Sequence, residues 1–311
     1  MKVGTNIMAK QNLAFFYGRV AKAPNVSQNL ETGKYGYAMA YLDTVRSLRE
    51  VDDKVRFVKH DHPLITSLEP AIIEKMVEWK ENDIVIVKGV VTSKRAPKGS
   101  ICPYCKDEKG VSTRNESDGN ILYVTPIHVQ TIKSYGEDKL AAIEDIISNR
   151  EISNQVYIYG TLLRDPKFYV TKQGVSITQY PIAINRKFTI RTDDPSIKTD
   201  YPFVKSYGEQ ARQDKTYLRY QAEIIADGFL QARRVKRKCT CKVCGKAYDW
   251  EDRMMEIVPY AVEYVSGQRT DEEVEQEFEH KVEEYKQMLF SKAVQNDILE
   301  PELQSSDIQG E

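Results

Sequence analysis

Two cysteine pairs, each with two residues between the thiols, are the clearest chemical signal in the sequence. They are Cys102-Pro-Tyr-Cys105 and Cys241-Lys-Val-Cys244. A tight turn with this spacing brings two thiolates onto one metal ion, and a structural Zn²⁺ ion takes four ligands. Because each pair supplies two, the economical arrangement is one zinc site shared by Cys102, Cys105, Cys241 and Cys244. We therefore expect a structural zinc ion that clamps two distant parts of the chain together.

Three alternatives to this shared site stay open. Cys239 could replace one of the four ligands. Two copies of the chain could each contribute one pair. The pairs could also be redox couples, although they lack the strand–helix–strand context of thioredoxin-like proteins. With five cysteines in all, the sequence does not resemble a secreted disulfide framework.

No catalytic constellation accompanies the cysteines. The chain has four histidines, and two of them lie in His60-Asp61-His62, which we interpret as a polar loop. A GxSxG elbow, an HExxH helix and a glycine-rich phosphate loop are all missing from the sequence. We therefore expect a protein without enzymatic activity.

The elements that must position the cysteines arise from an internal duplication. The segment Asn12–Gly18 resembles Asn154–Gly160 at an offset of 142 residues, and the two cysteine pairs repeat at an offset of 139. The offsets change only in segments that look like loops. The sequence therefore predicts two related units joined by a segment with helical periodicity.

Each unit is predicted to contain three strands, a helix and two further strands. In the second unit, Val156–Tyr159 and Ser176–Ile184 are β-rich, and Lys172–Gly174 is typical of a hairpin turn. This order is that of a five-stranded Greek-key barrel with a helix at its base. We predict a mainly β protein with a first unit over 1–133, a helical linker over 134–151, a second unit over 152–268, and a C-terminal helix and tail over 269–311.

The second unit resembles bacterial and phage single-stranded-DNA-binding proteins, which have an OB-fold. The segments that carry the resemblance are Asn154–Gly160, Arg164–Pro166, Ala183–Arg186, Tyr207–Gly208 and Ile224–Gly228. They extend over most of 154–265, whereas the first unit matches only through the internal repeat and is a diverged copy. The resemblance, together with the internal repeat, implies two tandem OB-folds. The spacing of the cysteine pairs places one zinc-knuckle loop between the last two strands of each unit.

The same resemblance implies which side chains would contact DNA. In that family aromatic side chains stack on bases with little sequence preference, and Lys and Arg follow the phosphates. The aromatic positions that match are Phe188, Tyr201 and Tyr207. The basic positions are Arg186, Lys187, Arg191, Lys205, Arg233, Arg234, Lys236 and Arg237.

The function that follows from the resemblance is binding and protection of single-stranded DNA, independent of sequence. It would serve replication, recombination, or the DNA metabolism of a phage or mobile element. One alternative is an OB-fold module for assembly or partner recruitment that has no affinity for DNA. A second alternative is RNA binding without a preference for single-stranded DNA.

The charge distribution separates a basic body from an acidic tail. The whole chain has 45 basic and 46 acidic residues, a net charge of −1. Thirteen acidic and three basic residues follow Arg269, so the tail carries −10 and the body +9. This asymmetry is typical of nucleic-acid-binding proteins with an acidic tail.

The tail is predicted to be a helix that begins with a capping box at Thr270–Glu273. Its apolar residues recur at helical spacing and form one stripe: Val274, Phe278, Val282, Tyr285 and Leu289. This helix would either pack on the body or recruit replication and recombination proteins.

Two expectations concern assembly and location. The family commonly works with four OB-folds, so we expect either a homodimer or a monomeric pseudo-dimer. The sequence has no apolar run long enough to span a bilayer and no recognisable secretion signal, so a cytoplasmic protein is expected.

Overall fold

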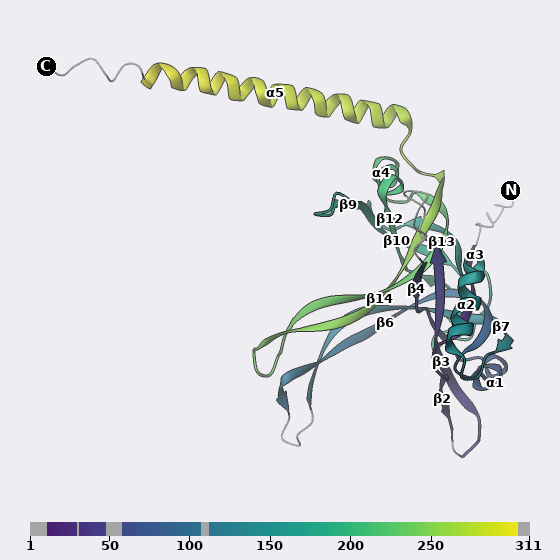
Figure 1. Ribbon diagram of the computed structural model, residues 1–311. Helices are drawn as coiled ribbons and strands as arrows, with labels where there is room; N and C mark the ends of the chain where they lie inside the picture. Colours follow the sequence, from purple (N-terminus) through teal and green to yellow (C-terminus); the bar gives the residue numbers. More distant parts are fainter. Residues whose placement is uncertain (1–10, 30, 48–57, 107–111, 304–311) are drawn as a thin grey trace, which may run out of the picture.

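The computed structural model describes residues 11–29, 31–47, 58–106 and 112–303. The protein is mainly β-sheet, with a long helix at its C-terminal end (Figure 1). The first half contains β1 (Asn12–Val20), β2 (Asn25–Gln28), β3 (Tyr35–Ser47), β4 (Val58–Asp61), β5 (Leu64–Ser67), α1 (Pro70–Val77), β6 (Asp83–Lys106) and β7 (Ser112–Ser134). Two short helices follow, α2 (Lys139–Ser148) and α3 (Arg150–Ser153).

The second half repeats this order. It contains β8 (Asn154–Leu162), β9 (Lys167–Val170), β10 (Ser176–Asn185), β11 (Thr199–Asp200), β12 (Phe203–Tyr207), α4 (Gly208–Tyr217), β13 (Glu223–Thr240) and β14 (Ala247–Ser266). The final helix is α5 (Asp271–Leu303). The predicted hairpin turn is confirmed, since Gly174 has a φ of 79° between β9 and β10.

All described strands belong to one connected network of hydrogen-bonded neighbours. In the first half the neighbours run β1–β6–β7–β5–β3, and a further β1–β3 pairing closes the ring. The second half runs β8–β13–β14–β12–β10, and a β8–β10 pairing closes it. The halves meet where β1 pairs antiparallel with β8, with Asn12 opposite Ile158 and Phe16 opposite Asn154. The duplication in the sequence therefore appears as two similar closed sheets that share one seam.

The repeated asparagines make the same contacts in both halves. The side chain of Asn12 donates to the Val91 carbonyl at 2.9 Å and accepts from the Val91 N–H at 2.8 Å. The Asn154 side chain makes the same pair of bonds with the backbone of Leu230, at 2.9 and 3.0 Å. Both asparagines are buried, so each would leave unsatisfied polar groups if replaced by an apolar residue. This explains why the sequence retains asparagine at both equivalent positions.

Part of the apolar core follows from alternation along the strands. In β8, for example, residues at every second position are buried, which is the period expected when one face of a strand packs inward. Trp79, which follows α1, and Tyr180 in β10 are the largest fully buried side chains. The Tyr180 hydroxyl donates to Asp214 of α4 at 3.0 Å, so the helix is tied to the core by a satisfied polar contact.

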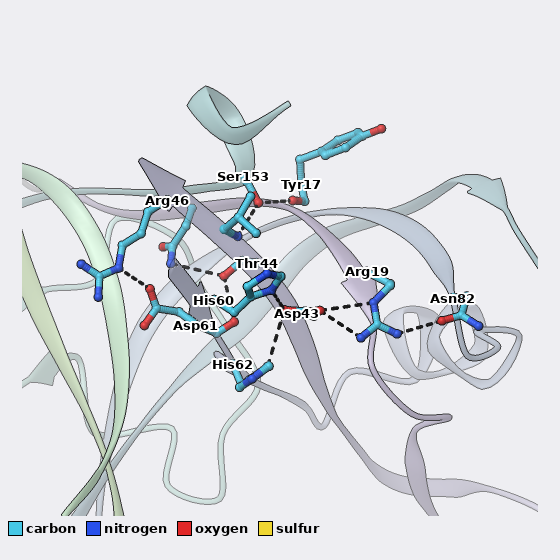
Figure 2. A network of polar contacts seen from close by, with 12 residues as sticks. Tyr17, Arg19, Asp43, Thr44, Arg46, His60, Asp61, His62, Asn82 and Ser153 are labelled. Carbon is cyan, nitrogen blue, oxygen red and sulfur yellow. Dashed lines mark hydrogen bonds and ion pairs between the residues drawn. The ribbon is translucent and has the colours of Figure 1, made fainter. Parts of the chain in front are cut away.

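A polar network at the rim of the first half connects its strands (Figure 2). Asp43 accepts hydrogen bonds from Arg19 at 2.9 Å and contacts Nδ1 of His60 at 2.7 Å. The Ser153 hydroxyl donates to the Tyr17 carbonyl at 2.7 Å and thereby joins α3 to β1. Our interpretation of this segment as a polar loop was wrong, because His60 and Asp61 belong to β4 and pair with β3, and Asp61 is buried.

The stability of this rim is predicted to depend on pH. The hydrogen bond with buried Asp43 raises the pKa of His60 above its usual value. A raised pKa in the folded state means that the stabilisation is complete below about pH 6.5 and is lost as pH rises through the shifted pKa. The free energy of unfolding in urea should therefore fall between pH 6 and pH 8.5. In His60→Gln the free energy of unfolding should fall less over the same pH range. If the variant and the unmodified protein show equal falls, the pH dependence belongs to another group.

The strands that carry the cysteines are much longer than predicted. The strand ranges predicted above for the second unit, Val156–Tyr159 and Ser176–Ile184, are short, whereas β6 has 24 residues and β13 has 18. Each pairs antiparallel with the next strand and forms a two-stranded ribbon, and the two ribbons project together from the closed sheets (Figure 1). We call these ribbons the first arm (β6–β7) and the second arm (β13–β14). The charged sequences of the arms lack the alternation that identifies a half-buried strand. The hydrophobic pattern therefore does not predict that the strands extend into the arms.

A glycine marks the equivalent irregularity in each long strand. The pairing register shifts at Gly89 in β6 and at Gly228 in β13. A Cβ atom at Gly228 would lie 2.1 Å from the Val258 carbonyl oxygen, and one at Gly89 would lie 2.7 Å from the Thr125 carbonyl oxygen. Glycine is therefore required by the close approach of two backbones at these bulges.

The C-terminal helix begins as predicted. Thr270 and Glu273 exchange the two hydrogen bonds of a capping box, at 3.0 and 3.2 Å. Only its first turns contact the body, through ion pairs such as Arg219–Glu273 at 3.1 Å. Farther along, the apolar stripe is open to solvent, with Phe278 68% and Tyr285 58% exposed. The helix therefore extends away from the body and does not pack on it (Figure 1). Among the described residues, none of the helices combines the length and apolar character needed to cross a bilayer.

Candidate functional site

Four of the five cysteines converge where the two arms meet. Cys102 and Cys105 lie at the end of β6, and Cys241 and Cys244 lie in the turn between β13 and β14. Their sulfur atoms are all within 4.8 Å of one another. Two sulfur pairs that join the arms, Cys102–Cys244 and Cys105–Cys241, are separated by 3.7 and 3.6 Å. A tetrahedral site with metal–sulfur bonds of about 2.3 Å requires sulfur separations of about 3.8 Å, so these thiols fit a tetrathiolate metal site.

Backbone N–H groups are directed at one sulfur of each cysteine pair. The N–H of Tyr104 donates to the Cys102 sulfur at 3.4 Å, and the N–H of Val243 donates to the Cys241 sulfur at 3.4 Å. Hydrogen bonds from the backbone N–H groups of Cys244 and Val243 lower the pKa of Cys241 to about 6. Equivalent turns in the two arms therefore present the sulfurs in the same way.

The fifth cysteine lies outside this group. Cys239 packs beside the cluster, and its thiol donates to the Thr240 carbonyl at 3.8 Å. It is not among the four residues whose sulfurs converge. The geometry therefore favours Cys102, Cys105, Cys241 and Cys244 over the alternative set that included Cys239.

Further polar contacts hold the two arms side by side. Tyr248 of the second arm places its hydroxyl 2.8 Å from the Ser100 hydroxyl and accepts from Asn115 at 2.9 Å, both in the first arm. The ammonium group of Lys98 lies 2.9 Å from buried Asp252. These contacts join the first arm to the second arm, so the two ribbons lie against each other and form one unit.

Two of the aromatic candidates sit where the halves adjoin. Tyr201 is 48% exposed, and its backbone N–H donates to the Ser93 hydroxyl of β6 at 2.8 Å. Phe188 is half-buried, with the ammonium groups of Lys187 and Lys88 each 5.9 Å from its ring centroid. Lys88 belongs to the first half, so the surface around Phe188 is built by both halves. Sequence analysis missed Lys88 because only the pairing of β1 with β8 brings it there.

The third aromatic candidate, Tyr207, lies at the end of β12. Its ring is half-buried and lies 5.6 Å from the Lys205 ammonium group. Its hydroxyl accepts a hydrogen bond from Gln231 of β13 at 3.5 Å. Tyr207 therefore borders the strand that continues into the second arm.

The basic candidates divide into an exposed group and a buried group. Five are exposed to solvent: Lys187, Arg191, Arg234, Lys236 and Arg237. Two of these also contact acids in the second arm, with Arg234 at 3.5 Å from Glu251 and Arg237 at 2.8 Å from Asp252. The Arg234–Glu251 pair is exposed on both sides and contributes little stability, so Arg234 can reorient toward an anion. Arg237 is held more firmly, because its partner Asp252 is buried.

The other three basic candidates are held by buried carboxylates. Arg186 is 7% exposed and binds both oxygens of Asp200, at 2.6 and 2.8 Å. Glu256 holds the other two, Lys205 at 3.8 Å and Arg233 through a bidentate pair at 2.8 and 2.9 Å. The structure thus places Arg186 and Lys205 inside the fold, where they make structural ion pairs.

The Arg186–Asp200 pair has an equivalent in the first half. There Arg46 contacts Asp61 at 2.6 Å. Each aspartate also accepts a backbone N–H from the opposite half, Asp200 from Ser93 at 2.8 Å and Asp61 from Ala232 at 2.9 Å. These symmetric contacts lock the two halves together. In these contacts Arg46 is the counterpart of Arg186.

Comparison with known proteins identifies the second half. Residues 153–243 match the single-strand binding protein family. The single-stranded DNA-binding protein of Thermotoga maritima is 28% identical over 81 residues, which is 26% of this chain and 57% of that protein. A single-stranded DNA-binding protein 1 from Staphylococcus aureus is 25% identical over 119 residues, 38% of this chain and 69% of that protein. The family resemblance recognised in the sequence is thereby confirmed for the second half.

A solved structure extends the similarity to both halves. A deletion mutant of the single-stranded DNA binding protein from Thermus aquaticus superimposes with a TM-score of 0.54 at 15% identity. The superposition covers 85% of this chain and all of that one. At this identity the comparison concerns the fold.

Proposed function

We propose that this chain, whose residues 153–243 match the single-strand binding protein family, binds single-stranded DNA without sequence preference. The observation that carries the proposal is the combination of exposed Tyr201 with half-buried Phe188 and Tyr207, bordered by exposed Lys187 and Arg191. Aromatic faces stack on any base, and basic side chains neutralise phosphates. The residues that would bind are Phe188, Tyr201, Tyr207, Lys187, Arg191, Arg234, Lys236 and Arg237, whereas Arg186, Lys205 and Arg233 position this surface.

We further propose that the two halves are tandem OB-folds. Two features support this assignment. The strands of each half close into a ring, and one helix precedes the long strand of that half, α1 before β6 and α4 before β13. The divisions at 1–133, 134–151, 152–268 and 269–311 then separate the first OB-fold, the linker, the second OB-fold and the tail. The four cysteines would hold a structural Zn²⁺ ion that fixes the two arms to each other.

Assembly and partners follow from the same proposal. One chain would act as a pseudo-dimer of OB-folds through the β1–β8 seam, and two chains would supply the four folds usual for the family. The acidic, solvent-exposed α5 would recruit replication or recombination proteins through its apolar stripe. The protein would act in the cytoplasm on DNA during replication, recombination, or phage and mobile-element metabolism, with no catalytic step of its own.

The proposal is tested by titrating the full chain with fluorescein-labelled oligo-dT across a range of salt. Binding should be micromolar or tighter and should weaken with salt, with a slope of about −0.7 per phosphate contacted. Replacing Tyr201 or Tyr207 by Ala should each lower affinity by about 1–3 kcal/mol. Tyr285→Ala, which removes a similarly exposed aromatic ring from α5, is the matched control and should leave affinity unchanged.

Two results would contradict the proposal. Equal affinity for duplex and single-stranded DNA of one sequence would favour an assembly module. Stronger competition by RNA than by DNA of that sequence would favour the RNA-binding alternative.

A further inference from the structure

A groove runs between the arms and connects the two halves. It consists of two adjoining cavities of about 520 and 260 Å³. The larger reaches Tyr41 and His62 of the first half, and the smaller reaches Pro202 and Phe203 of the second half. Both are lined by the same central residues from the two arms: Asn120, Leu122, Trp250, Met254 and Met255. The groove is therefore a continuous surface shared by both units of the repeat.

The two cavities reach equivalent positions of the duplication. Leu64 lines the larger cavity and Phe203 lines the smaller one, and they are separated by 139 residues, the offset of the cysteine pairs. The Tyr201 carbonyl accepts a hydrogen bond from Asn120 of the groove at 3.3 Å, so the proposed aromatic surface of the second half continues into the groove. A strand that stacks on Tyr201 would meet the groove next.

The lining combines flat apolar side chains with positive charge. Trp250 is half-buried, and the Arg253 guanidinium lies 5.2 Å from the centroid of the Tyr41 ring. Basic side chains outnumber acidic ones, since the only acid in the lining is Asp252, which is already paired with Lys98 and Arg237. Aromatic rings and methionines accept the faces of nucleobases, and arginines accept the phosphates between them.

We propose that this groove binds nucleobases of single-stranded DNA, and that the bound DNA lies along the groove from Tyr201 in the second half to Tyr41 in the first. Trp250 is the central stacking residue, and Arg253 is the phosphate contact beside it. The proposal rests on the proposed function and adds two central residues, Trp250 and Arg253, that lie outside the segment matching the family, which ends at residue 243. It also gives the diverged first half a role, because its Tyr41 and His62 complete a site that neither half forms alone.

The experiment uses the two tryptophans of the chain as reporters. Trp79 is 2% exposed in the core, whereas Trp250 faces the groove. Oligo-dT should quench the tryptophan emission of the full chain, and Trp79→Phe, which leaves only Trp250, should retain the quenching. Trp250→Phe should abolish it. Trp250→Ala should weaken binding measured by anisotropy at least fivefold, the lower limit for losing one stacked base.

Arg253→Gln provides a second variant at an exposed position, and it should reduce the salt slope by about 0.7. Thermal unfolding of each variant verifies that it is folded. Oligo-dT binding by anisotropy without quenching of Trp250, together with unchanged affinity for Trp250→Ala and Arg253→Gln, would overturn the groove and leave the proposed function intact. Absence of any binding to oligo-dT would overturn both.

Discussion

Protein purified under reducing conditions should contain one zinc ion per chain, and Cys241→Ser should remove it. The four sulfurs already have the spacing of a tetrahedral site, with 3.6 and 3.7 Å between partners on opposite arms. Metal binding to sites of this kind contributes about 10–16 kcal/mol in zinc-finger peptides. The ion would add to the hydrogen bonds of Tyr248 with Ser100 and Asn115, so its loss should loosen the ends of both arms while the closed sheets stay folded.

Metal analysis and hydrogen exchange measure this result. After chelation, amides around Ser100 and Tyr248 should lose protection, while those of the β1–β8 seam should keep theirs. Cys239→Ser is the matched control, because Cys239 lies outside the four converging thiols, and it should retain zinc and protection. Zinc loss in Cys239→Ser would assign that residue to the site. Zinc-free protein with fully protected arms would refute the metal site.

Arg186→Ala should destabilise the fold by about 3–5 kcal/mol, the usual result of leaving a buried charge without its partner. The Arg186 side chain is 7% exposed, and Asp200 is fully buried. The guanidinium of Arg186 also donates to the Ile197 carbonyl at 2.7 Å. The hydrogen bond with Asp200 raises the pKa of Arg186, so the guanidinium group remains charged. Urea unfolding at pH 7 measures the loss.

Arg191→Ala is the control for this prediction. Arg191 is exposed and lies a few residues farther along the chain, so its replacement should change stability by less than about 0.5 kcal/mol. It should instead reduce the salt slope of DNA binding by about 0.7. The opposite pattern, with a stable Arg186→Ala protein and a reduced salt slope, would return Arg186 to the DNA-binding surface.

Features that depend on local sequence were predicted well. The hairpin turn at Gly174 and the capping box at Thr270 and Glu273 involve residues within a few positions of each other, and both appear in the structure. The helix of the first repeat, α1, has apolar residues at helical spacing, namely Ile72, Ile73 and Met76. The equivalent helix α4 is polar and carries no such pattern. The arms were missed because charged strands paired with each other carry no such pattern.

The role of individual basic residues was beyond sequence analysis. Arg186 and Arg191 have the same chemistry and lie five residues apart, yet the first is buried against Asp200 and the second is exposed. Residue type and a family match select both as phosphate contacts. Only the position of Asp200, brought alongside by the pairing of β10 with β11, separates them.

The sequence alone determined that this chain is a β-rich duplication with two cysteine pairs, a family-like second unit and an acidic helical tail, because repeats, spacings and local periodicity are properties of the linear chain. The tertiary structure decided how the units are joined. Asp61 bonds to Ala232 and Cys102 approaches Cys244 across well over a hundred residues. The tertiary structure also forms the groove that connects the two halves, with Tyr41 at one end and Phe203 at the other. Such contacts depend on which strand edges meet, and that is settled by long-range backbone pairing and packing rather than by the residues next to each site.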